Sequence, residues 1–133
     1  MIAIVISIIC WCFFCIFEGR FEAILWHLWA RTPIFGFNPH KTKLLMYRRL
    51  TIIILASIAN PLLFFAHALV FPFIHSGAMY SHRNDIDCDV YEDRWESEPS
   101  PTSSAEINFS FNVRYVLFVL GCLLYIGILF NQS

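Results

Sequence analysis

Three long runs of apolar residues constrain the fold of this 133-residue chain more than any other feature. They cover Ile2–Phe17, Leu50–Ile74 and Val113–Phe130, and the only charge inside them is Arg114. Charged residues make up 14% of the chain, and eight of its ten acids lie between the second and third runs. A water-soluble domain spreads its charges over its whole surface, so this segregation indicates a polytopic membrane protein. We therefore predict an all-α membrane protein with a single domain, residues 1–133.

The lengths of the runs predict three transmembrane helices. A helix needs about 20 apolar residues to cross a hydrocarbon core of ~30 Å. The first run has 16 residues, so it either continues through Glu18 or spans a locally thinner bilayer. The third has Arg114 near its start, and this side chain must reach the interface. The predicted spans are about 2–17 or longer, 50–74 and 112–130.

The two segments between the runs carry opposite charge. Residues 18–49 hold six basic and two acidic side chains, whereas residues 75–108 hold two basic and eight acidic ones. Cytoplasmic or matrix loops of membrane proteins are enriched in Lys and Arg. We therefore expect a basic loop, 18–49, on the inner side and an irregular acidic loop, 75–111, on the outer side. Three crossings then place the N-terminus outside and the C-terminus inside.

Residues 21–30 predict an amphipathic helix on the inner side. Apolar residues recur at helical spacing, and Trp26 and Trp29 supply rings typical of a membrane interface. A helix that docks on a partner subunit is the alternative. The basic residues of Lys41–Arg49 suit anionic lipid headgroups. The expected interface anchors are the two tryptophans together with Arg48, Arg49 and Arg114.

Polar residues within the second run predict one helix face directed at protein or water. Ser57, Asn60 and His67 fall on one side of a continuous helix, and lipid contact would be costly for the last two. Pro61 removes a backbone donor and should kink the helix beside Asn60. We expect these side chains to hydrogen-bond between helices. A proton or ion path along the same face is the alternative.

The five cysteines predict no disulfide framework. Four of them lie within the runs, and only Cys88 lies in the acidic segment. Cys12 and Cys15 have the spacing of a redox pair, but a membrane redox enzyme needs a second pair to accept its electrons. We expect these thiols to pack as small apolar side chains.

The acidic segment partly matches a calcium-binding loop. Its acids occupy ligand positions 1, 3, 5, 9 and 12 of an EF-hand, at Asp85, Asp87, Asp89, Asp93 and Glu96. The glycine that such a loop requires at position 6 is replaced by Val90. We therefore expect a solvated acidic surface and assign no metal or cofactor. A weak divalent-cation site formed by these five acids is the alternative.

The sequence holds no nucleotide-binding loop, zinc-protease motif, nucleophile elbow or haem-ligand pair. Its net charge of −1 also argues against nucleic-acid binding. We expect a non-catalytic accessory subunit of a larger membrane complex, whose partners are other membrane subunits. An organellar energy-transducing complex of the mitochondrial inner membrane, such as a respiratory-chain or ATP synthase assembly, is favoured. The alternatives are an accessory subunit of a channel, transporter or biosynthetic complex in the endomembrane or plasma membrane, a homo-oligomeric channel or carrier using Ser57, Asn60 and His67, and a small membrane enzyme using Glu18, Glu22 or His67.

Overall fold

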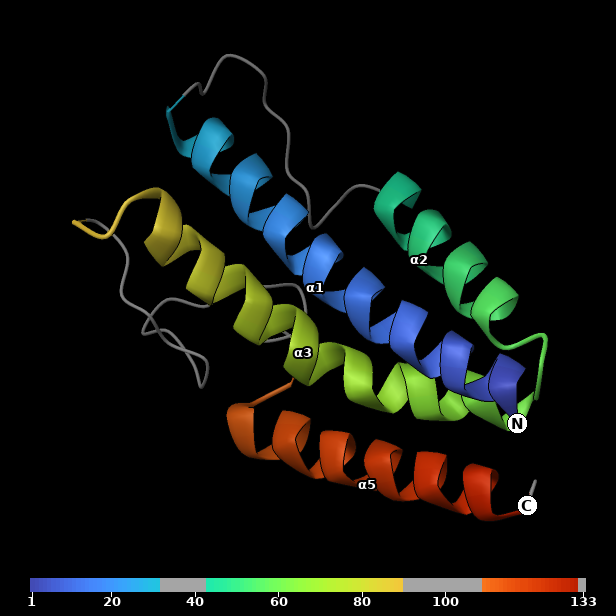
Figure 1. The fold of residues 1–133 in the computed structure, drawn as a ribbon. Helices are drawn as coiled ribbons and strands as arrows, with labels where there is room; N and C mark the ends of the chain where they lie inside the picture. The colour runs from blue at the N-terminus through green and yellow to red at the C-terminus, as the bar shows by residue number, and fades with distance from the viewer. Residues whose placement is uncertain (32–42, 90–108, 132–133) are drawn as a thin grey trace.

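The computed structural model describes residues 1–31, 43–89 and 109–131, and the regular structure in these ranges is helical. Four helices are present in these ranges: α1 Ile2–Arg31, α2 Lys43–Ala56, α3 Leu62–Ile86 and α5 Phe111–Phe130 (Figure 1). Of these, α1, α3 and α5 are long and apolar enough to cross a membrane. The prediction of an all-α, multi-pass membrane protein with three candidate spans is therefore confirmed.

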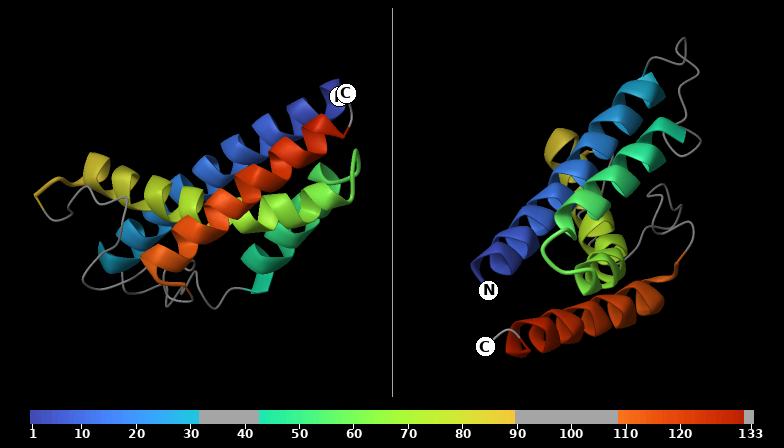
Figure 2. Two further views of the ribbon diagram at one scale, coloured as in Figure 1. Left: turned by 90° about the horizontal axis from the view of Figure 1, so that it is seen from below. Right: turned by 90° about the vertical axis from the view of Figure 1, so that its right-hand side faces the viewer.

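Helix α3 lies at the centre, with α1 on one side, α5 on the other, and α2 against α1 and α3 (Figures 1 and 2). The contacts define the direction of each helix. Ser7, near the start of α1, contacts His67 of α3. Glu22, farther along α1, contacts His75, which is also farther along α3, so the two helices run in the same direction. Helices α2 and α5 run the opposite way, and α1 begins at the same end of the bundle at which α5 ends.

The predicted second span, 50–74, does not form one helix. Helix α2 ends at Ala56, and α3 begins only at Leu62. Pro61 has no amide proton, and the Oδ1 atom of Asn60 accepts a hydrogen bond from the backbone amide of Leu62 at 2.9 Å. The Asn-Pro pair therefore starts a new helix instead of kinking the old one. The membrane-compatible segment shifts toward the C-terminus, to Leu62–Ile86.

Two helices extend beyond the predicted limits of their spans. Residues 21–30 continue α1 without a break, and α3 runs through 75–86, which we assigned to an irregular outer loop. The two extensions pack against each other through Ala23, Met79 and Tyr80, all fully buried. This small second core explains why both helices remain ordered past the apolar runs.

The helix directions also differ from the simple alternation of three spans that the prediction assumed. Because α1 and α3 run in the same direction, their C-terminal residues, Arg31 and Ile86, lie at the same end of the bundle. The prediction placed the segments that follow these residues on opposite sides of the bilayer. The prediction assumed that three successive spans alternate in direction. In the structure, α2 lies between α1 and α3 in the sequence and brings the chain back to the end at which α1 began.

Two glycines sit where helices cross closely. A Cβ atom on Gly19 of α1 would lie 2.4 Å from the carbonyl oxygen of His75, and one on Gly121 of α5 would lie 3.1 Å from that of Ala66. No atom lies within 4 Å of the same position on Gly127. Small residues therefore allow α3 to contact both of its long neighbours.

Thiol labelling tests the arrangement of the helices in a bilayer. In single-cysteine variants, we expect native Cys88 and Met46→Cys to react with an impermeant reagent from one side of a vesicle. We expect Ile2→Cys to react only from the other side, because α1 starts at the opposite end. Labelling of Cys88 and Met46→Cys from opposite sides would contradict the parallel course of α1 and α3.

Substitution of the glycines tests the helix crossings. Gly19→Ala should lower the free energy of unfolding by about 1–3 kcal/mol, because its methyl group meets backbone atoms that cannot move aside. Gly127→Ala is the matched control and should be neutral or stabilising by up to ~1 kcal/mol. Thermal unfolding in detergent micelles measures both, and equal effects would argue against a close crossing at Gly19.

Candidate functional site

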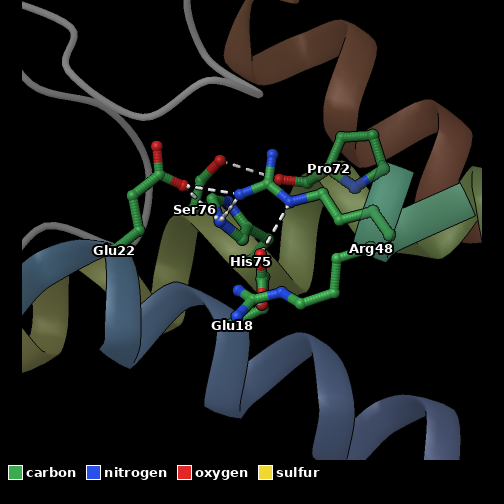
Figure 3. Close-up of polar contacts among 7 residues, drawn as sticks. Glu18, Glu22, Arg48, Pro72, His75 and Ser76 are labelled. Atoms are coloured by element: carbon green, nitrogen blue, oxygen red, sulfur yellow. Dashed lines mark hydrogen bonds and ion pairs between the residues drawn. The ribbon is translucent and has the colours of Figure 1, made fainter. Parts of the chain in front are cut away.

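Five ionisable side chains meet inside the bundle where α1, α2 and α3 come together (Figure 3). We name them the ionic cluster. It consists of Glu18 and Glu22 of α1, Arg48 and Arg49 of α2, and His75 of α3. The two acids lie four residues apart, and this spacing places them on one face of a helix.

The two arginines and the histidine bind both carboxylates. Arg49 donates from Nε to Oε1 of Glu18 at 2.9 Å and from Nη2 to Oε2 of Glu22 at 3.0 Å. Arg48 donates from Nη2 to the other oxygen of Glu18. The Nε2 atom of His75 lies 2.6 Å from Oε2 of Glu22. Each carboxylate therefore bridges two residues from other helices.

The acids and the histidine of the ionic cluster are buried, whereas the side chains of Arg48 and Arg49 are 34% and 18% exposed. Glu18, Glu22 and His75 are 1%, 2% and 0% exposed. Two carboxylates face two guanidinium groups, so the formal charges of these four side chains balance. The aromatic ring of Phe71 stacks on His75 at 4.9 Å and also lies beneath Arg49. Such an arrangement lowers the cost of keeping charges away from water.

A second polar group lies about two turns along α3 and joins all four helices. We name it the hydrogen-bond chain. His67 of α3 contacts the hydroxyl of Tyr125 in α5 through Nδ1 and that of Ser7 in α1 through Nε2. Ser7 in turn donates to the carbonyl oxygen of Ala56, the last residue of α2. Trp11 stacks on the His67 ring and donates from Nε1 to its backbone carbonyl at 2.9 Å.

The structure does not place the predicted polar face on one helix. Ser57 and Asn60 lie between α2 and α3, whereas His67 lies within α3. Ser57 donates to the carbonyl of Ile53 at 2.6 Å, and Asn60 accepts from Leu62. Only His67 makes the interhelical contacts that we expected of all three.

The predicted interface anchors also lie in different surroundings. Arg48 and Arg49 belong to the ionic cluster, and Arg114 is fully buried at the start of α5, with its guanidinium 5.8 Å from the ring of Phe111. Trp26 is half-buried against the small core between α1 and α3. The side chain of Trp29 lies outside the described residues.

The acids considered for a cation site are only partly described. Asp85, Asp87 and Asp89 lie at the end of α3 and just beyond it, whereas Asp93 and Glu96 fall outside the described residues. Asp85 is mostly exposed and lies 3.7 Å from His82. Within the described ranges, no group of three or more His, Cys, Asp or Glu side chains is arranged to hold a metal ion. The five cysteines are free thiols.

The ionic cluster was not predicted from the sequence, in which Glu18, Glu22 and the two arginines were assigned separate roles. One signal was present, because two acids four residues apart follow an apolar run and an Arg pair precedes the next one. No protein-family model matches the chain, and neither a curated protein nor a solved structure is significantly similar to it. The chemistry must therefore be judged from the geometry alone.

Neutralising Glu18 tests the contribution of the ionic cluster. Glu18→Gln removes the carboxylate that binds both arginines, and breaking a buried ion pair typically costs about 3–5 kcal/mol. We expect a loss of this size in the free energy of unfolding in micelles. Asp85→Asn is the control, because an exposed pair contributes about 0–1 kcal/mol. Equal effects would show that the cluster does not hold the helices together.

Proposed function

We propose that this protein is a non-catalytic accessory subunit of a larger multi-subunit membrane complex and contributes to its assembly and stability. One observation supports this best. The ionic cluster and the hydrogen-bond chain join the helices to one another, whereas the outward surface carries many large apolar side chains. An enzyme or carrier would direct some of its ionisable groups at a substrate or ion.

The length of α1 adds a second argument for a protein partner. Its 30 residues extend roughly 45 Å, which exceeds the ~30 Å hydrocarbon core. Beyond the ionic cluster, Ile24 and Leu28 lie one turn apart and are still 42% and 53% exposed. A neighbouring subunit would cover these side chains where α1 passes out of the hydrocarbon.

Among membrane complexes, we favour an energy-transducing complex of the mitochondrial inner membrane, such as a respiratory-chain or ATP synthase assembly. It rests on the small size and the aromatic content of 17%, and the same features suit an accessory subunit in the endomembrane or plasma membrane. The partners in this proposal are unlike membrane subunits and lipids. Arg48 and Arg49 bind the carboxylates of the ionic cluster. Anionic lipid would therefore bind mainly the two lysines that precede them in the sequence, Lys41 and Lys43.

The proposal also gives the bundle an orientation. All nine Lys and Arg residues lie between positions 20 and 114 of the sequence, and those within α1, α2, α3 and α5 lie away from the end where α1 begins. Positive residues favour the inner side of a membrane. We therefore propose that the end of the bundle at which α1 and α3 terminate faces the cytoplasm or matrix, with both termini opposite.

The alternatives receive less support from the geometry. A channel or carrier along Ser57, Asn60 and His67 would need these groups to be available to an ion, but Ser57 and Asn60 bind backbone atoms. His67 contacts two hydroxyls. A membrane enzyme using Glu18 or Glu22 would first have to break their ion pairs.

Purification after mild detergent extraction tests the proposed function. We expect the tagged protein to elute in a large particle together with several unlike polypeptides. A photo-reactive residue in place of Leu28 should form an adduct with one of these polypeptides. The same residue in place of Leu123, on the exposed face of α5, is the control and should react mainly with lipid.

A monomer or small homo-oligomer without other polypeptides would overturn the accessory-subunit proposal. A homo-oligomer that releases trapped ions from vesicles would favour the channel.

A further inference from the structure

The hydrogen-bond chain has a direction that can be derived from its chemistry. We infer that the Ala56 carbonyl, through Ser7, sets the tautomer of His67, and that Tyr125, His67 and Ser7 act as a one-way relay of donors through which α5 holds the C-terminal end of α2. The relay is a conformational device of the fold, separate from the proposed contacts with other subunits.

The direction is set at the end nearest α2. A backbone carbonyl can only accept, so the single hydroxyl proton of Ser7 is used on the oxygen of Ala56. The Ser7 oxygen must then accept from the Nε2 atom of His67, which lies 3.1 Å away. Nε2 therefore carries a proton.

The protonation of Nε2 also determines the state of the second ring nitrogen, Nδ1. A neutral imidazole carries one N–H group, so Nδ1 is an acceptor and the hydroxyl of Tyr125 donates to it. The ring partners are two hydroxyl groups and the backbone of Ala56, and none of these compensates a buried positive charge as a carboxylate would. His67 is therefore the neutral Nε2–H tautomer, and every donor in the chain points from α5 toward α2.

The relay ends on a group that otherwise has no partner within its own helix. The last four carbonyls of a helix lack intrahelical donors, and Ala56 is the last residue of α2. Ser7 supplies the missing donor from α1. Trp11 stacks on the imidazole with ring centroids 5.0 Å apart and so limits rotation of His67. A change at Tyr125 should thus reach Ala56, although the two residues lie on different helices.

Nitrogen NMR of the imidazole of His67 in lipid nanodiscs tests the tautomer. We expect the wild-type protein to show a protonated Nε2 and an unprotonated Nδ1. Tyr125→Phe should keep this tautomer, because Ser7 still accepts from Nε2. Ser7→Ala removes that acceptor but frees the Ala56 carbonyl beside His67, so the proton should stay on Nε2 and the Nε2 signal should shift with its new partner. A wild-type spectrum with the proton on Nδ1 overturns the inference by itself, even if a variant does not fold.

Hydrogen exchange tests the coupling between the helices. Tyr125→Phe should raise amide exchange in residues 55–60 by about 2- to 10-fold, the effect of losing one buried hydrogen bond. Tyr115→Phe is the matched control, because Tyr115 lies on the exposed face of the same helix, and it should leave this segment unchanged. Equal exchange in both variants, or a tautomer that shifts in Tyr125→Phe, overturns the relay.

Discussion

The arrangement of this bundle depends on one requirement: charges that lie among apolar helices must be paired. Glu18 and Glu22 cannot remain buried alone, and the nearest cations in the fold belong to Arg48 and Arg49. Bringing these residues together holds α2 alongside α1 in the opposite direction. The chain then begins α3 at the same end at which it began α1, so the ion pairs and the parallel course of α1 and α3 belong together.

The apolar helices were predictable from the sequence, whereas the break within the second run was not. Long uncharged runs have few ways to satisfy their backbone other than as helices. The break depends on the backbone bonds of Ser57 and Asn60 and on Ser7, a residue about 50 positions away. A local signal at Pro61 predicts a kink and a helix start equally well. Only tertiary contacts separate the two outcomes.

The ionic cluster shows what a count of charges between apolar runs leaves out. Counting Lys and Arg treats every charge between two spans as part of a loop that faces water. Arg48, Arg49 and His75 instead lie on helices and bind the carboxylates of α1. The sequence contains these residues but not their pairing, because pairing requires the relative directions of α1, α2 and α3. His67 was identified correctly as a polar residue of a helix interior, since lipid contact would have been costly wherever that helix began.

Polar contacts at the middle and at the C-terminal end of α2 compensate for its small apolar interface. Lipid is as apolar as a leucine side chain, so burial of apolar surface adds little to helix association in a bilayer. The arginines attach the middle of α2 to α1 and α3, and the hydrogen-bond chain holds its last residue, Ala56. Trp11 and Phe71 pack between these two levels, with ring centroids 6.1 Å apart. Within the described residues, the polar groups of the interior therefore bind one another, and the large exposed apolar side chains lie on the outer surface.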